Sequence, residues 1–571
     1  MGERNGNQVM YYLRDRRLDV CYDEESDNDV DGEEVHEEIA DEQDADEDSD
    51  FDELRRRQVD EIEENIQPRL GRPRSVIKGK NNFKWSTIAP ESRGRRSFHV
   101  YLPSAREEAK NVSTPLEAWT LLFTPEMLEM IIQHTNEEIE RNRVNIENQN
   151  ASFCRNTDIV ELKALIGLLY FTGMEKHNHT NLEDLWSPQF GYNLYRAVMP
   201  ERRFQYLLQN LRFDEKNSRN VRRTEHALAP IKELWDAFIV NCKKYYSPST
   251  NCTIDEQLLG FRGRFAAQVY IANKPDKYGI KIVSCNDVQT SYTIDAEPYV
   301  GRIETAAGDT VPSYYIKKLT ETIRNTGRNI TCDNWFMSVN IVREMKHNYS
   351  LSMVGTLRKN KPEIPSTFLQ STAAGTVRYA YADGMTLLSY SPKRNKVVLL
   401  LSSLHKRGHM NEEIGKPDIV AFYNATKGGT DTFDQLCKCY STSRITKRWP
   451  MRLFFGMLDQ AGVNSAVLYN LREANSALNC RSFLKELTFS LIKPHLEDRL
   501  RKSTLRRSVR TLVSEVLEVN EHRSNETGRL QKRKRCSVCS WRDNKKTLYS
   551  CASCGSPVCD DHRTHFCHNC A

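Results

Sequence analysis

Hydrophobic residues recur with a helical period over two parts of the chain. Residues 123–139 combine a Thr-Pro start, typical of a helix N-terminus, with apolar residues three and four positions apart. Residues 158–171, 202–211 and 231–240 have the same period, as do 449–469 and 480–501. We therefore expect helices over about 115–250 and again beyond 432.

Between these parts the pattern changes to short β-branched and aromatic runs separated by turn residues. Such runs are typical of strands. We predict strands at 252–254, 265–271, 278–285, 291–294, 330–332 and 351–355. Further strands, including 386–391 and 396–403, indicate a β-rich insertion over 362–420.

The charge of the chain is unevenly distributed. Its 571 residues hold 82 Lys and Arg against 77 Asp and Glu, a net charge of +5. Residues 23–53 contain 19 of the acids and no base, so the remainder has 58 acids against 82 bases, a balance of +24. We expect residues 1–95 to be a disordered acidic region, either a solubilising tail or a mimic of DNA that competes for the basic surface. The apolar stretches are too short for a membrane helix, so we expect no membrane partner.

Cysteines and histidines cluster at the C-terminus, where seven of the sixteen cysteines lie within 536–570. Their paired spacing is typical of structural zinc, which prefers four thiolate or imidazole ligands. We favour an alternating, cross-braced pairing, although consecutive pairing also fits the spacing. One zinc ion would then take Cys536, Cys539, Cys559 and His562, and the other Cys551, Cys554, Cys567 and Cys570.

Four aspartates occur in settings that suit a metal centre. Asp255 and Asp333 follow strand-like runs, and Asp431 begins a helix after two glycines, with Asp434 one turn later. Each alone would usually be a cap or turn residue. Together, carboxylates of this kind can hold two Mg²⁺ ions that stabilise the attacking and leaving oxygens of a phosphodiester.

Several longer motifs resemble the piggyBac family of DNA transposases. They are TIDEQLLGFRGR (253–264), YIANKPDKYGIKI (270–282), NITCDNWF (329–336), VGTLRKNKPEIP (354–365), TKGGTDTFDQ (426–435) and SRITKRWPM (443–451). The spacing of the C-terminal Cys and His residues is similar too. The resemblance extends from about residue 115 to 571.

The resemblance implies an RNase H-like α/β catalytic core interrupted by the β-rich insertion. The core would comprise 251–361 and 421–440, with the insertion at 362–420 between them. A helical dimerisation and DNA-binding domain would be built from 96–250 and 441–530, and a cross-brace zinc module from 531–571. The catalytic triad falls on Asp255, Asp333 and Asp431, with Asp434 in a supporting role.

The implied activity is Mg²⁺-dependent cut-and-paste transposition by a nuclear homodimer. DNA would be nicked at the transposon ends, converted to hairpins, reopened and joined to TTAA target sites, without any small-molecule substrate. The alternative is a domesticated, transposase-derived DNA-binding or chromatin protein without catalysis. The zinc module is also compatible with a protein-binding role.

Basic residues near the aspartates and in a Trp-containing segment are candidate DNA contacts, because phosphate binding needs cations and an aromatic ring can stack on an opened strand. Trp449 could equally be a core residue. The candidates are Arg262, Arg264, Lys274, Lys277, Arg358, Lys359, Arg444, Lys447, Arg448 and Trp449.

Overall fold

The computed structural model describes residues 75–91, 100–272, 274–301, 303, 305, 308–370, 373–519, 529–551 and 555–562. The chain divides into two compact units, with the boundary between Glu497 and Asp498. Within the described ranges, no helix has the length and apolar character needed to cross a membrane.

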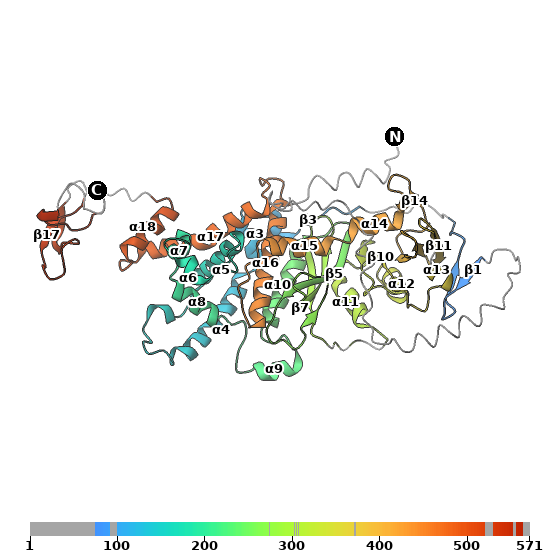
Figure 1. The fold of residues 1–571 in the computed structure, drawn as a ribbon, viewed down its shortest axis with the longest axis horizontal. Coiled ribbons are helices and arrows are strands. Elements are labelled where there is room, and N and C mark those ends of the chain that lie inside the picture. The colour runs from blue at the N-terminus through green and yellow to red at the C-terminus, as the bar shows by residue number, and fades with distance from the viewer. Residues whose placement is uncertain are drawn as a thin grey trace. The chain divides into compact units, whose positions relative to one another are not determined.

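The first unit is organised around one large mixed sheet (Figure 1). Its central strand β5 (Asn251–Gly260) pairs in antiparallel fashion with β7 (Tyr278–Asp287) and in parallel with β9 (Asn329–Cys332). Beyond these lie the antiparallel β8 (Thr293–Pro298) and the parallel β10 (Ser352–Thr356). Five of the six strands predicted over 252–355 are thus confirmed; over 265–271 only β6 (Val269–Tyr270) forms.

The insertion is a continuation of this sheet. Strand β13 (Val398–Ser402) pairs with β10, followed by β12 (Met385–Tyr390) and β11 (Val377–Ala382). Val354, Leu388 and Leu400 from three neighbouring strands belong to one buried apolar cluster. This shared core explains why the strands of 362–420 extend the sheet and do not form a separate β unit.

A hairpin from the N-terminal region completes the far edge of the sheet. Strands β1 (Val76–Lys78) and β2 (Lys84–Ser86) pair with each other, and β2 joins β11 at Tyr381. Trp85 is fully buried, and its indole N–H donates to the Glu363 carbonyl at 2.8 Å. The prediction of disorder over 1–95 is therefore wrong for 75–91, because this tryptophan anchors an otherwise polar segment. Residues 1–74, with the acidic run, and 92–99 lie outside the described part.

Helices that precede the central strands in the chain pack against a helix that follows them. Indole Nε1 of Trp119 donates to the Tyr170 hydroxyl at 2.9 Å, which in turn donates to the Leu458 carbonyl at 2.7 Å. This buried chain links three helices: α3 (Pro115–Leu122), α5 (Ile159–Met174) and α16 (Trp449–Asn470). The neighbouring helices of the first segment are α4 (Pro125–Arg143), α6 (Leu182–Trp186), α7 (Asn193–Val198), α8 (Glu201–Asn210), α9 (Arg219–Glu225) and α10 (Lys232–Tyr245).

Further helices lie against the sheet. They are α11 (Val311–Leu319), which contacts β7 and β8, α12 (Val339–Asn348), which contacts β10, and the pair α14 (Asp418–Thr426) and α15 (Gly429–Cys439), which contacts β5.

The second unit begins within the last turns of α17 (Cys480–Arg501), earlier than the boundary at 531 that we predicted. Helix α18 (Arg507–Val516) belongs to it, since the Arg510 guanidinium donates to the Leu500 carbonyl at 2.7 Å. Arg507 also bonds to Ser556, which links α18 to the Cys-rich module. The module contains the pair β16 (Arg529–Arg535) and β17 (Lys546–Tyr549).

The role of Trp85 can be tested by limited proteolysis. Replacing a buried tryptophan by alanine typically costs about 3–5 kcal/mol, and here the loss falls on an edge hairpin. We expect Trp85→Ala to make 75–91 sensitive to protease while the rest of the first unit stays resistant. The exposed Trp541→Ala provides the control. Equal resistance of wild type and Trp85→Ala would contradict this account of the hairpin.

Candidate active site and metal-binding cluster

Strand register places two aspartates side by side. Ile254 of β5 is paired with Cys332 of β9 in a parallel ladder. Asp255 and Asp333 each come one residue later, so they lie opposite each other. Neighbouring strands lie about 4.8 Å apart. Asp333 directly follows β9, as expected, whereas Asp255 lies in the middle of β5 and not at its end.

Helix α14 covers one face of the sheet beside β5 and β9. The hydroxyl of Thr253 donates to the Thr426 carbonyl at 2.6 Å, and the hydroxyls of Thr331 and Thr426 are 2.8 Å apart. Side chains two residues apart on a strand share a face. Asp255 and Asp333, two positions beyond these threonines, therefore point to the side on which α14 ends.

A close approach of backbone to sheet brings the third aspartate to this face. Helix α15 starts at Gly429, where a Cβ atom would lie only 2.8 Å from the Thr253 hydroxyl oxygen. A larger residue would push the helix away from β5. Asp431 lies in the first turn of this helix.

Electrostatics indicate that the three carboxylates converge. The pKa of Asp255 is raised well above its ordinary value, first by burial and then by the negative charges of Glu256, Asp333 and Asp431. Lys274 opposes this shift. A like-charged cluster of this kind is unfavourable without cations, and perturbed carboxylates gather at functional sites.

Lys274 is placed within the acidic cluster. Its ammonium Nζ lies 2.9 Å from Oδ1 of Asp431, and its side chain is only 18% exposed. Burial opposes its charge, but Asp431, Asp255 and Asp434 together raise its pKa. In the structure this lysine pairs with Asp431; the DNA contact that we predicted at this position stays a prediction.

Asp434 has different surroundings. It is buried, and its Oδ2 lies 2.9 Å from Nζ of Lys438 on the same helix. Among the residues that the structure describes, its Oδ1 has no hydrogen-bond partner. The negative charge of Asp434 contributes to raising the pKa of Lys274.

The donor set of the triad suits hard divalent cations. Mg²⁺ prefers carboxylate oxygens, and three carboxylates from separate elements supply them. Their oxygens do not all lie within 4.8 Å of one another; in the described ranges, only one group of three or more potential ligands is that compact. Asp255, Asp333 and Asp431 thus fit a divalent-metal site chemically, with Lys274 at Asp431.

The compact group is the set Cys536, Cys539, Cys559 and His562. The Cys539 sulfur lies 3.5 Å from that of Cys559 and 3.4 Å from His562 Nδ1. The structure thus joins the first Cys pair to Cys559 and His562, as in alternating pairing. Of the second predicted set, Cys554, Cys567 and Cys570 lie outside the described residues.

Two predicted DNA contacts are occupied within the protein. Arg444 donates to the carbonyls of His177 and Thr180, both at 2.7 Å. Arg448 donates to the carbonyl of Gln209, at 3.0 Å, and to that of Leu211 beyond the end of α8. Burial, followed by the charge of Arg212, lowers the pKa of Arg448 to about 9. Both guanidinium groups therefore join chain segments in the structure, and their assignment as DNA contacts stays a prediction.

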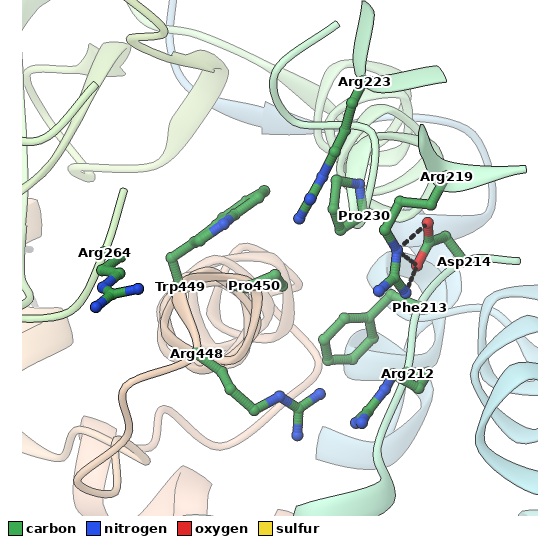
Figure 2. A pocket seen from close by; sticks show the side chains of 10 residues that line it. All are labelled: Arg212, Phe213, Asp214, Arg219, Arg223, Pro230, Arg264, Arg448, Trp449 and Pro450. Carbon is green, nitrogen blue, oxygen red and sulfur yellow. Dashed lines mark hydrogen bonds and ion pairs between the residues drawn. The ribbon is translucent and has the colours of Figure 1, made fainter. Parts of the chain in front are cut away.

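A cavity of about 310 Å³ lies beside Trp449 and is rich in arginine (Figure 2). Trp449 is half-buried and packs against Phe265, with ring centroids 5.1 Å apart, so it is not a core tryptophan. Arg219 is held by Asp214, whereas the exposed Arg223 points toward Trp449. The lining comprises Arg212, Phe213, Asp214, Arg219, Arg223, Pro230, Arg264, Arg448, Trp449 and Pro450.

The remaining basic candidates lie mostly on the surface. Arg358 is half-buried, and its Nε donates to the Asn334 side chain at 3.0 Å. The exposed members are Arg262, Arg264, Lys277, Lys359 and Lys447.

Comparison with known proteins identifies the family. The family model described as Transposase IS4 matches residues 114–466, more than half of the chain. A solved structure, the piggyBac transposase synaptic complex with hairpin DNA, is 36% identical in sequence with a TM-score of 0.74, covering 82% of this chain and all of that one. The chain belongs to the piggyBac-type Transposase IS4 family.

Curated relatives of this piggyBac-type chain include two human proteins. "PiggyBac transposable element-derived protein 3" is 22% identical over 362 residues, which cover 59% of this chain and 58% of the relative. "Chimeric ERCC6-PGBD3 protein" is also 22% identical over 362 residues, covering 59% of this chain and 32% of its own length. The chain thus spans little more than half of the first relative and a third of the second.

Three arginines between the end of α8 and the end of α9 were not among the DNA contacts predicted for this piggyBac-type protein. Arg212, Arg219 and Arg223 line the cavity although they are far from Trp449 in sequence. The basic run at 219–223 was a usable signal, because its arginines recur at helical spacing.

The Cys₃His cluster predicts metal-dependent folding of the C-terminal module, since so small a unit has little apolar core. We expect a chelator that removes structural metal to unfold 529–562, which circular dichroism and protease sensitivity of the full chain would report. Cys559→Ala should reproduce this loss without chelator. Cys480→Ala, at a buried cysteine outside the cluster, is the matched control. A module that stays folded after metal removal would contradict the assignment.

Proposed function

We propose that this protein is a cut-and-paste DNA transposase whose catalytic triad is Asp255, Asp333 and Asp431. The observation that carries the proposal is the matched register of Asp255 and Asp333, with Asp431 close enough to raise the pKa of Asp255. The strand order β8-β7-β5-β9-β10, with β5, β9 and β10 parallel, supports an RNase H-like core.

The triad would hold two Mg²⁺ ions. When bound, such ions stabilise the charge that develops on the attacking and leaving oxygens of a phosphodiester. The chain's own contribution is positional: two strands and one helix hold the carboxylates, while Thr253 and Thr331 fix the end of α14 beside them. We propose the same site for nicking, hairpin formation and opening, and joining of 3′-OH ends to TTAA target DNA.

Double-stranded DNA would be held by the exposed basic side chains near the triad and by the cavity beside Trp449. Exposed cations release counter-ions from the phosphate backbone, and an aromatic side chain can stack on an unpaired base. Arg262, Arg264 and Lys277 lie on the connection between β5 and β7, close in sequence to Asp255. Arg223 and Arg264 reach the cavity from the two sides of Trp449 (Figure 2).

The other parts of the proposal concern assembly and location. We propose two structural zinc ions in the C-terminal module, one of them on the Cys₃His cluster. The related structure is described as a synaptic complex with hairpin DNA, which supports DNA as a partner. We propose transposon ends as that DNA and a homodimer as the working form. The exposed basic strand β16 favours a nuclear protein that contacts DNA.

A non-catalytic, domesticated protein is the second candidate, because one of the similar human proteins is named as transposable element-derived. The presence of Asp255, Asp333, Asp431 and Asp434 at all four expected positions favours catalysis.

Strand cleavage of matched transposon ends tests the triad. We expect Asp255→Asn, Asp333→Asn or Asp431→Asn each to lower cleavage at least ~100-fold, because each removes a ligand charge from the centre. Binding to the ends should change little. Asp236→Asn, at an exposed helix position, is the control. Normal cleavage by all three variants would refute the site, and binding without cleavage by the wild type would favour the domesticated reading.

The cavity can be tested through the salt dependence of DNA binding. A side chain that contacts phosphate contributes about one unit to the slope of log K against log salt. We expect Arg223→Ala to weaken end binding and to lower this slope by about that amount. The exposed Arg394→Ala, in the loop between β12 and β13, should leave both unchanged. An unaltered slope for Arg223→Ala would exclude it from the DNA interface.

A further inference from the structure

Lys274 lies on a short turn that backbone hydrogen bonds hold in place. Tyr270 of β6 pairs with Tyr278 of β7, and the Ile271 N–H donates to the Lys277 carbonyl at 2.8 Å. The Lys277 N–H donates back to the Lys274 carbonyl at 3.1 Å. The turn therefore limits how far the Lys274 ammonium can travel from the carboxylates.

Two lysines near Lys274 have acidic partners of their own. Lys281 lies 3.3 Å from Glu256 and above the Trp335 ring, 4.1 Å from its centroid. Lys438 lies 2.9 Å from Asp434. Lys274 pairs with a member of the triad, with its Nζ 2.9 Å from Oδ1 of Asp431.

This pairing conflicts with metal binding at the same carboxylate. A Mg²⁺ ligand oxygen lies about 2.0–2.1 Å from the ion. An ammonium hydrogen-bonded to the same carboxylate would lie within a few ångströms of a divalent ion, where like charges repel strongly. Asp431 has two carboxylate oxygens, but two cations this close weaken each other's binding, so the ammonium and a metal ion compete for it.

We propose that Lys274 is the triad's own counter-cation, and that a divalent metal ion must displace its ammonium group from Asp431. The short turn would keep the displaced ammonium beside the site, where it can bind a phosphate oxygen. Lys274 would thus be a positioning residue that links metal loading to DNA phosphate binding. This inference rests on the proposed function, because it needs the triad to be the metal site.

The affinity for Mn²⁺ tests the proposal. It is measured on the full-length protein without DNA, with electron paramagnetic resonance reporting the free ion. Coupling between two ligands of one site typically changes affinity 5- to 150-fold. We expect Lys274→Met and Lys274→Gln to bind Mn²⁺ about tenfold more tightly, since a competing cation is gone. Lys274→Arg, which keeps the charge, should stay near the wild-type affinity. Lys277→Met makes the same charge change on the same turn and should alter Mn²⁺ affinity less than about twofold.

Thermal unfolding gives a second readout that does not depend on catalysis. Without added divalent metal or chelator we expect Lys274→Gln to melt below wild type, because the carboxylates lose their counter-ion. Mn²⁺ should then raise its melting temperature more than that of wild type. If the wild type binds Mn²⁺ normally and both neutral variants bind it equally or more weakly, the inference about Lys274 is overturned. The proposed metal centre is then unaffected. Wild-type Mn²⁺ binding that Asp255→Asn does not weaken would overturn the proposed metal centre and the inference with it.

Discussion

Repulsion between carboxylates is the constraint on which the site depends. The parallel register of β5 and β9 sets Asp255 beside Asp333, and α15 adds Asp431. Burial, and then the negative charges of Glu256, Asp333 and Asp431, raise the pKa of Asp255, as expected where carboxylates gather. The surrounding contacts hold the acids together despite it: threonine hydroxyls fix the end of α14, Gly429 allows α15 to approach, and Lys274 supplies a positive charge.

The arginines around this centre divide into two groups by burial and partner. Arg444 and Arg448 donate to backbone carbonyls and join the Trp449 segment to the first helical segment. Arg223 and Arg264 are exposed at the cavity beside Trp449. The first group links two chain segments, and the second gives the cavity positive charge at the surface. This division explains how a basic segment can be both a structural joint and part of a DNA-binding surface.

Alternating and helical periods in the sequence were sufficient to predict most strands and helices, but contacts between distant segments were not predictable from them. The hairpin of 76–86 was missed because a single anchor, Trp85, outweighs its polar composition. The carbonyl contacts of Arg444 and Arg448 were not predictable, because a guanidinium that binds carbonyls has the same sequence signature as one that binds phosphate. Convergence of the aspartates came from family resemblance, since strand register is a tertiary property.

The central claim is that Asp255, Asp333 and Asp431 form one divalent-metal centre. Oxidative cleavage of the backbone by bound Fe²⁺, with ascorbate and peroxide, maps such a centre directly in the full-length protein. The account predicts cuts close to Asp255, Asp333 and Asp431, all suppressed together by excess Mg²⁺. Cuts at only one of the three positions, or cuts that Mg²⁺ does not suppress, would contradict it.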